Sequence, residues 1–297
     1  MTTTSPPLPP PTSPSQPYIH ISALDAGHLD IEAWEILADA REEDNELLRV
    51  PSLAFLLTHS VSGKKMMFDL GIRRASERTV EGEPNVLVPQ TSEEALRKGG
   101  VDPGDVEVVV LSHLHWDHVG LASEYPNATF IVGPDCTHLI DEPHPELYVL
   151  PNPVPSHSTQ PLTASSFPTS IGPFPQALDY FSDGSLYLIN SPGHFPGHLN
   201  ALLRTSPSGS WVYLAGDTVH DWRVLKGEKA MARFHHPKHG LVCAHEDFEA
   251  AKVHVERVRA LVEVPRVLVL IAHDWEWFEA NKGGEAFLPG RIPPKLD

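Results

Sequence analysis

The sequence predicts an α/β protein in which strands are followed by covering helices in both halves of the chain. Two observations lead to this fold class. Short apolar runs rich in β-branched residues, at 106–112, 211–215 and 267–272, are typical of buried strands. Residues 246–262 carry apolar side chains at three- and four-residue steps, which predicts an amphipathic helix that covers a sheet.

The other elements follow from similar patterns. Residues 1–17 are rich in proline and lack both the basic and the apolar region of a signal peptide, so they are expected to form a disordered or polyproline-type tail up to Pro17. Residues 18–297 are expected to form one domain. Its further strands are predicted at Tyr18 to Leu24, Leu53 to His59, Lys65 to Leu70 and Leu199 to Leu203, and a short helix at Ser92 to Lys98.

A segment rich in proline and serine occupies residues 150–180. Loops of this length without periodicity are usually functional or disordered. Because it joins two groups of motifs described below, we expect an insertion near the mouth of the active site rather than a linker between domains.

The hexapeptide His113-Leu-His115-Trp-Asp117-His118 directly follows the predicted strand 106–112. If the chain stays extended, His113, His115 and Asp117 share one face, whereas a turn would send Asp117 and His118 toward a neighbouring point. Imidazoles crowded at this density gain most from a shared cation, so a metal site is favoured over a surface loop. Such ligands suit zinc, with iron and manganese as alternatives.

Further motifs complete a pattern that resembles the metallo-β-lactamase superfamily. They are Phe68-Asp69-Leu70-Gly71, Ser191-Pro-Gly-His194-Phe-Pro-Gly-His198, Leu214-Ala-Gly-Asp217 and the run from Val267 to His273. All stand in the order in which that family's fold supplies them, over about two thirds of the chain. The resemblance implies a four-layer αβ/βα metallo-β-lactamase sandwich and a single catalytic domain.

The resemblance also implies ligands for two metal ions, taken to be Zn²⁺. One ion would be held by His113, His115 and His194, the other by Asp117, His118 and His273, with Asp217 bridging them. The β-lactamases of the family use a cysteine in the second site and lack a histidine after the aspartate. Here Cys136 and Cys243 fall in neither motif. Penicillin hydrolysis is therefore not expected.

Two cations that share a water lower its pKa and hold it as hydroxide, and one of them polarises the substrate carbonyl, which predicts a hydrolase. Asp117 is expected to orient this nucleophile or to pass a proton to the leaving group. Asp69 is expected either to order a ligand histidine or to serve as a turn residue.

Within the superfamily the motifs look closest to the N-acyl homoserine lactonase-like group. The leading hypothesis is a dinuclear hydrolase that opens an acyl homoserine lactone or another small lactone or ester, which would make it a quorum-quenching enzyme. Lactonases of that group place a tyrosine three residues after the bridging aspartate, where this chain has His220. We expect His220 to be catalytic, as a hydrogen-bond donor to the oxyanion. A solvated loop residue is the alternative.

Other functions remain as alternatives. A metallo-β-lactamase-type thioesterase is the first of them, although the glyoxalase II version is disfavoured by the 24 residues (297 − 273) that follow His273. A non-catalytic metal-binding protein is disfavoured because the ligand set is complete. A redox di-iron protein is disfavoured because position 115 is histidine, where that branch has glutamate.

The remaining histidines are expected to play lesser roles. His198 is expected to support a ligand or to lie in the core rather than to bind metal. The segment Phe234-His235-His236-Pro237-Lys238-His239 has no strand before it and is expected to be a surface loop near the substrate mouth.

Composition limits the partners. Lysine and arginine number 22 against 39 aspartate and glutamate, a net charge of −17, which would repel a nucleic acid backbone. No run approaches the roughly 20 apolar residues that a membrane helix needs. Two cysteines far apart suggest reduced thiols and a cytoplasmic protein. A small-molecule substrate is the expected partner, without nucleic acid or membrane.

Overall fold

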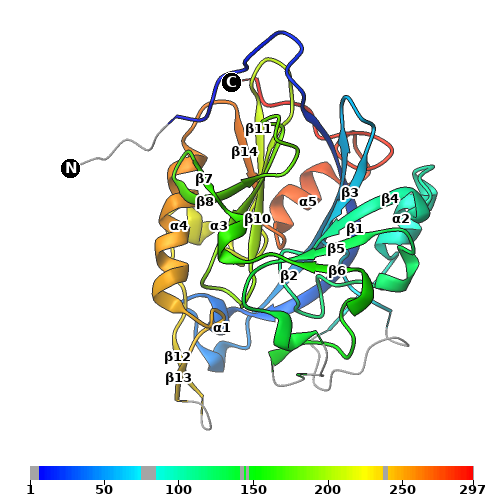
Figure 1. Ribbon diagram of the computed structural model, residues 1–297. Coiled ribbons are helices and arrows are strands. Elements are labelled where there is room, and N and C mark those ends of the chain that lie inside the picture. The colour runs from blue at the N-terminus through cyan, green and yellow to red at the C-terminus, as the bar shows by residue number, and fades with distance from the viewer. Residues whose placement is uncertain (1–6, 75–84, 141–143, 145–146, 237–239, 297) are drawn as a thin grey trace.

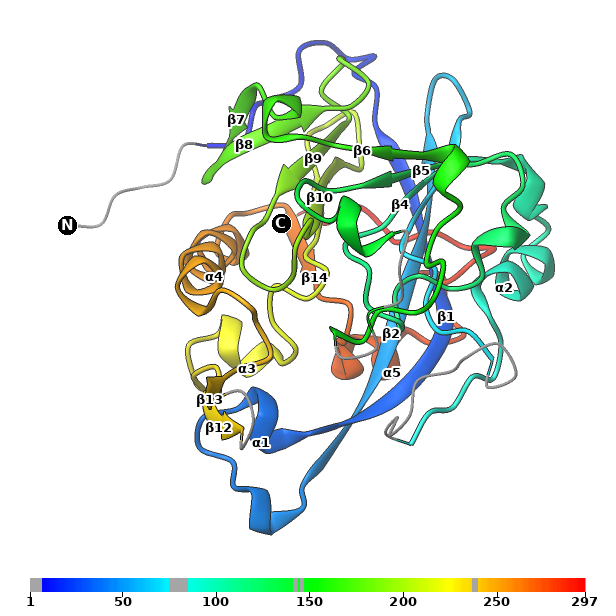
Figure 2. The same ribbon diagram turned by 60° about the horizontal axis from the view of Figure 1, so that its bottom comes forward.

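The computed structural model describes residues 7–74, 85–140, 144, 147–236 and 240–296. It contains two six-stranded sheets that pack against each other face to face (Figures 1 and 2). The first contains, in spatial order, β1 (Ile19–Glu32), β2 (Leu47–His59), β3 (Lys65–Phe68), β4 (Val106–Val110), β5 (Thr129–Val132) and β6 (Thr159–Pro161). The second contains β14 (Val267–Leu270), β11 (Trp211–Leu214), β10 (Leu199–Arg204), β9 (Leu186–Asn190), β8 (Phe174–Asp179) and β7 (Thr169–Ile171).

The helices are α1 (Ala33–Ile36), α2 (Ser92–Lys98), α3 (Trp222–Leu225), α4 (Phe248–Val262) and α5 (Trp275–Asn281). A separate hairpin consists of β12 (Phe234–His236) and β13 (Gly240–Val242). Among the described residues, no helix is both long enough and apolar enough to cross a membrane.

Successive side chains of a strand point to opposite faces of its sheet and pack into three hydrophobic cores. Leu57 of β2 and Leu203 of β10 lie in the core between the two sheets. Leu56, the neighbour of Leu57, points to the other face of the first sheet, where α2 contributes to the core. Leu202 of β10 likewise points outward, to pack with Val258 of α4. This period of two requires a helix-covered layer outside each sheet. The predicted αβ/βα sandwich is confirmed.

The predicted helices are present, and local residues explain where they begin. α2 starts at a capping box, in which the side chains of Thr91 and Glu94 bond each other's backbone N–H groups. α4 starts after Asp247, whose carboxylate accepts a hydrogen bond from the N–H of Ala250. The face of α4 that the periodicity predicts as apolar is buried at Val255 and Val258.

β1 and β2 are longer than predicted, with 14 and 13 residues. They pair in antiparallel fashion, with an irregularity in register between Asp25 and His28. Figure 2 shows their far ends reaching past the body of the first sheet toward α1, α3 and the β12–β13 hairpin. We call this part of the chain, residues 29–50, the β1–β2 arm. Charged residues such as Asp30 and Arg49 interrupt its apolar pattern, so periodicity does not reveal it.

The proline-rich segment 150–180, expected to be an insertion near the mouth of the active site, contains strands of both sheets. It connects the two sheets, because it supplies the edge strand β6 to the first sheet and both β7 and β8 to the second. Proline is tolerated at sheet edges, where a missing N–H breaks no ladder. The chain approaches the metal-binding motif just before this segment, where the N–H of Trp116 donates to the carbonyl of Tyr148.

The segment before Tyr18 differs from the expected disordered tail. Within its described part, residues 7–17, the carbonyl of Pro9 accepts a hydrogen bond from Arg204, with 3.0 Å between Nη2 and O. Gln16 is buried and its Nε2 donates to the carbonyl of Asp183 over 2.8 Å. A proline-rich chain has no internal hydrogen bonds, so its carbonyls are free to accept from a neighbouring sheet. Residues 1–6 lie outside the described residues.

Candidate metal centre

The predicted ligands all lie in loops that follow the C-terminal ends of strands. The hexapeptide with His113 to His118 follows β4, His194 follows β9, Asp217 follows β11 and His273 follows β14. β4 is parallel to both its neighbours, and β11 is parallel to β14. Loops at the carboxyl ends of parallel strands meet at one edge of a sheet, which is where α/β proteins usually bind ligands.

The hexapeptide does not stay extended. The N–H of His118 donates to the carbonyl of His115 over 3.1 Å, which closes a turn around Asp117. Of the two geometries that the sequence leaves open, the turn is therefore the correct one. It separates the first two histidines of the motif from Asp117 and His118.

Three imidazoles form the first group of side chains. Nε2 of His113 lies 2.8 Å from Nδ1 of His115, and Nε2 of His194 lies 3.2 Å from each of them. Tetrahedral Zn–N bonds of about 2.0–2.1 Å place neighbouring ligand atoms roughly 3.3 Å apart. The carboxylate of Asp217 completes the group, with Oδ2 at 3.5 Å from His194 Nε2.

Asp117, His118 and His273 form the second group. Oδ2 of Asp117 lies 3.5 Å from His118 Nε2 and 3.6 Å from His273 Nε2. Asp217 lies between the two groups, because its Oδ1 is 3.3 Å from His118 Nε2 and its Oδ2 is 3.2 Å from His273 Nε2. The structure thus brings together all seven predicted ligands, in the two sets that the sequence motifs imply.

Burial and charge favour a bound cation in this cluster. Burial lowers the pKa of His115 to about 3 and holds those of His113 and His194 well below their usual value, so these imidazoles are neutral, as metal ligands must be. Nε2 of His118 and Oδ1 of Asp217 are buried and have no hydrogen-bond partner within the described part of the chain. The cluster is therefore consistent with a divalent metal site.

The charges around His118 and Asp217 point the same way. Burial alone lowers the pKa of His118, but the carboxylates of Asp217, Asp117 and Asp69 outweigh it and raise the pKa well above its usual value. Burial alone raises the pKa of Asp217, but His118 and His273 outweigh it and hold the pKa well below its usual range. This excess of buried carboxylate calls for positive charge, which a divalent cation supplies.

A second layer of hydrogen bonds orients the ligand rings. Nδ1 of His118 donates to Asp69 over 2.9 Å, and Asp69 also accepts from the N–H and hydroxyl of Ser112. Nδ1 of His273 donates to the carbonyl of Pro51 over 2.8 Å. In both rings Nε2 is left to face the cluster. Of the two roles expected for Asp69, its contacts match the ordering of a ligand histidine.

His198 supports the bridging position rather than the metal. Its Nδ1 donates to the carbonyl of Ser191 over 3.0 Å, and its Nε2 accepts from the N–H of Asp217 over 3.1 Å. Burial lowers its pKa to about 4, which keeps the ring neutral and able to accept. This contact agrees with the supporting role expected from the sequence.

Replacing Asp69 by asparagine is expected to weaken metal binding by about 10–100-fold, the usual cost of losing a hydrogen-bond partner of a ligand. The amide cannot accept from Ser112 and His118 as the carboxylate does. Competition with a chromophoric chelator measures the affinity, and Asp105→Asn, at an exposed position, is the control. Affinity equal to that of the unmodified chain would leave Asp69 as a turn residue only.

His220 also faces the centre. Its Nε2 lies 3.4 Å from Oδ2 of Asp217, and its ring stacks on that of His273 at 5.6 Å between centroids. The side chain is only 10% exposed, which does not match a solvated loop residue. Asp217, His220 and His273 also form a third possible ligand group.

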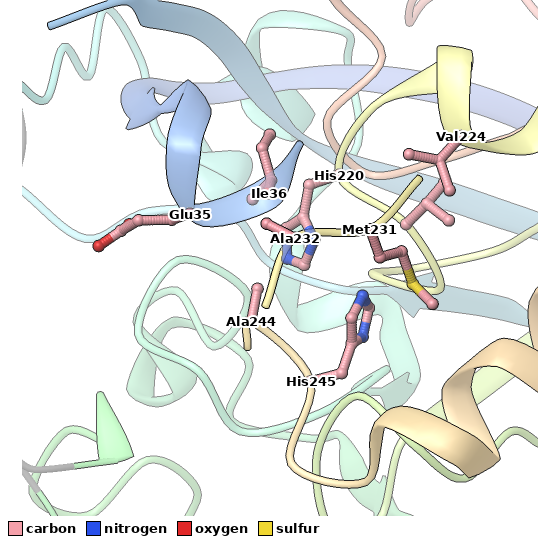
Figure 3. A pocket seen from close by; sticks show the side chains of 9 residues that line it. Glu35, Ile36, His220, Val224, Met231, Ala232, Ala244 and His245 are labelled. Carbon is pink, nitrogen blue, oxygen red and sulfur yellow. The ribbon is translucent and has the colours of Figure 1, made fainter. Parts of the chain in front are cut away.

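His245 is the residue near the centre that the sequence analysis missed. It precedes α4, and its ring centroid lies 5.2 Å from that of His194 and 5.4 Å from that of His220. Figure 3 shows His220 and His245 in the lining of the same small pocket. His245 follows no predicted strand and belongs to no motif, so the sequence carries no signal for it. The expected surface loop at 234–239 is wrong for residues 234–236, which form β12; Pro237 to His239 lie outside the described residues.

Comparisons with known proteins agree with this architecture. A family model described as the metallo-beta-lactamase superfamily matches residues 47–273. The cytochrome P450 monooxygenase mpaDE of Penicillium roqueforti (strain FM164) is 28% identical, over 93% of this chain and 35% of its own length. The gamma-lactamase FDB1 of Fusarium pseudograminearum (strain CS3096) is 34% identical, over 59% of this chain and 46% of its own length.

The N-acyl homoserine lactonase AttM of Azorhizobium caulinodans is 28% identical, over 62% of this chain and 65% of its own length. The chain spans about a third of the length of mpaDE. Among solved structures, an N-acyl homoserine lactone hydrolase with N-hexanoyl-L-homoserine at its catalytic metal center has a TM-score of 0.70 and 18% identity, and the match covers 93% of this chain and 99% of that one. At this identity the likeness shows a shared fold.

Proposed function

This chain belongs to the metallo-β-lactamase superfamily, and we propose that it is a dinuclear-metal-dependent hydrolase that opens a small lactone. The observation that carries the proposal is the position of Asp217, which lies within 3.7 Å of ligand atoms from both groups of side chains. A carboxylate in this position can be shared by two cations, which is the usual arrangement in two-metal hydrolytic sites.

In this proposal the seven ligands hold two Zn²⁺ ions, with iron or manganese as alternatives. The first group would hold one ion and the second group the other, with Asp217 between them. Two bound cations supply an activated water and polarise the substrate carbonyl. Oxygen and nitrogen ligands without a cysteine support the same choice of metals.

Two side chains of the centre would act on the substrate itself. Asp117 would take up the proton that the attacking water releases and pass it to the departing alkoxide when the ring opens, since its carboxylate belongs to the second group, 3.6 Å from His273 Nε2. His220 would donate a hydrogen bond to the carbonyl oxygen as negative charge develops on it. Its partly exposed ring supports this role, since the ring is in contact both with the centre and with an adjoining pocket.

The kind of bond that is hydrolysed in the substrate is proposed from the motifs and the relatives. The motifs and the likeness to AttM, a lactonase, support a cyclic ester. A γ-lactam is the second candidate, because FDB1, a gamma-lactamase, has the higher identity to this chain. A thioester is the remaining alternative. If the substrate is an acyl homoserine lactone, the reaction is quorum quenching. The free cysteines support a cytoplasmic location.

A substrate panel tests the proposed function. The zinc-loaded chain is expected to hydrolyse lactones with a higher kcat/KM than thioesters, with γ-lactams between them and phosphodiesters last. A pH-indicator assay follows ring opening, and the metal-free chain is the control. Turnover of a thioester with kcat/KM at least about a hundredfold above every lactone, a difference of roughly 2.7 kcal/mol in transition-state stabilisation, would replace the lactonase assignment by the thioesterase one.

A further inference from the structure

Asn200 is a polar residue inside the hydrophobic layer of the second sheet. It interrupts the apolar run of β10, between Leu199 and Ala201, and it is fully buried. Burial of an amide is unfavourable unless its N–H and C=O groups have hydrogen-bond partners. The contribution of Asn200 to the molecule therefore depends on its partners.

The side-chain amide of Asn200 has one orientation that satisfies its neighbours. Its Nδ2 donates to the carbonyl of Ala215 over 2.6 Å and to that of Leu199 over 3.1 Å. Its Oδ1 accepts from the hydroxyl of Tyr213 and from Nε2 of His254, each over 2.7 Å. A flipped amide would place its oxygen against two carbonyls, so these partners fix which atom is nitrogen and which is oxygen.

The carbonyl of Ala215 belongs to the turn that carries Asp217. The N–H and the hydroxyl of Thr218 close this turn, residues 215–218, by donating to the same carbonyl over 3.0 and 2.7 Å. Oγ1 of Thr218 also lies 3.1 Å from Oδ1 of Asn200. The amide of Asn200 thus contacts both ends of the turn, and the residue with the bridging carboxylate lies between them.

Gly216 makes the conformation of this turn dependent on its surroundings. Its φ is +48°, in the left-handed region that glycine adopts without strain. A β-carbon at this position would lie 2.8 Å from Nε2 of His198, which accepts from the N–H of Asp217. Glycine has little conformational preference of its own, so hydrogen bonds from His198 on one side and Asn200 on the other select the shape of the turn.

His254 connects the amide to α4, which lies along the outer face of the second sheet (Figure 1). Burial holds the pKa of His254 well below its usual value, so the ring is neutral, and Nε2 carries its proton because it donates to Asn200. The ring of Phe174 stacks on that of Tyr213 at 4.9 Å between centroids and lies 5.6 Å from that of His254. Packing therefore holds both donors in place.

We propose that Asn200 is a positioning residue of the metal centre, whose amide holds the turn 215–218 so that the carboxylate of Asp217 lies between the two groups of ligands. The inference rests on the proposed function, since it explains how the carboxylate that two cations would share is placed. Among the described residues, Asn200 bonds the turn at a carbonyl and a hydroxyl and makes no hydrogen bond to the carboxylate itself. It acts through Asp217.

Metal binding by Asn200→Leu tests this role without a substrate. Leucine has a similar volume but neither donates nor accepts a hydrogen bond, so the turn loses one of its supports. The weaker of the two zinc affinities is expected to fall about 10–100-fold, the usual cost of losing a hydrogen-bond partner that orients a ligand. Competition with a chromophoric chelator measures it. Asn190→Leu is the matched control, because this asparagine lies in the neighbouring strand β9 and bonds Gln176 instead of the turn.

Cobalt loading supplies a signature that a loss of stability alone does not change. Two Co²⁺ ions that share a ligand are magnetically coupled, whereas two ions with separate ligands are not. With both sites filled, the unmodified chain and Asn190→Leu are expected to show this coupling in electron paramagnetic resonance, and Asn200→Leu is expected to lose most of it. Full coupling together with unchanged zinc affinities in Asn200→Leu would overturn the positioning role.

Two variants of His254 test whether the orientation of the amide matters. His254→Leu removes the donor to Oδ1 of Asn200 and is expected to weaken the same zinc affinity about tenfold or more. His254→Gln keeps a side-chain N–H and is expected to recover most of this loss. If Asn200→Leu does not fold, this pair decides, and full zinc affinity in His254→Leu then overturns the proposal. Equal losses in both variants would assign the effect to packing of α4 and would overturn it as well.

These measurements separate the two hypotheses. A chain that binds two coupled cations only while Asn200 is present, but hydrolyses no lactone, lactam or thioester, would contradict the proposed function and leave the positioning role in place. Lactone hydrolysis with equal kcat and equal metal binding in Asn200→Leu would leave the proposed function in place and overturn the positioning role. An equal loss of zinc affinity in Asn190→Leu would show a general weakening of the sheet and would overturn it too.

Discussion

Asp217→Ala is expected to lower kcat/KM by at least about a thousandfold, more than the roughly 10²–10³-fold cost of one lost hydrogen-bond donor in an active site. The reason is its position between the two groups of ligands, where its two oxygens lie 3.3 Å from His118 Nε2 and 3.2 Å from His273 Nε2. Without this carboxylate, the site loses the negative charge that two cations would share.

Elemental analysis of protein purified without chelator provides the second measurement. The unmodified chain is expected to contain about two transition-metal ions, since seven ligands exceed what one tetrahedral ion uses. Asp217→Ala is expected to retain less than one. Asp105→Ala, which removes an exposed carboxylate, should retain both. If Asp217→Ala loses one ion, holds the other normally and remains active, Asp217 does not bridge them.

His220→Ala is expected to lower kcat by roughly ten- to a thousandfold with unchanged metal content, as for the loss of a donor that acts on the developing oxyanion. Steady-state kinetics and elemental analysis on the same preparation check this. The position of the His220 ring also allows the role of a metal ligand, because His220 forms a possible ligand set with Asp217 and His273. Loss of metal together with activity would assign it to the centre.

Substitution of His220 by tyrosine separates these two roles further. A phenol can donate the same hydrogen bond but is a poor replacement for an imidazole ligand of zinc. If His220 is an oxyanion donor, the tyrosine variant is expected to recover much of the turnover that alanine loses. Unchanged kinetics in the alanine variant would show that the side chain, although close to Asp217, takes no part in the reaction.

Much of this molecule is predictable from local sequence. Runs such as 106–110 and 267–270 form strands because β-branched side chains suit a pleated, buried surface, and α2 spans the predicted residues 92–98, starting at a capping box. The seven candidate ligands are also predictable, because the short motifs that contain them resemble those of the metallo-β-lactamase superfamily and stand in the same order along the chain.

The surroundings of the centre depend on tertiary contacts. The carbonyl that orients His273 belongs to Pro51, 222 residues away in sequence, and His245 is placed by backbone bonds to the loop of His194. A carbonyl carries no side-chain signal, and a single histidine before a helix has no periodicity to reveal it. The sequence by itself therefore determined strands such as β4 and β14 and the helices α2 and α4, through local propensity and alternation, and the ligand motifs through their resemblance to the metallo-β-lactamase superfamily. Only the packing of distant loops decided which groups orient the ligands and which pocket adjoins them.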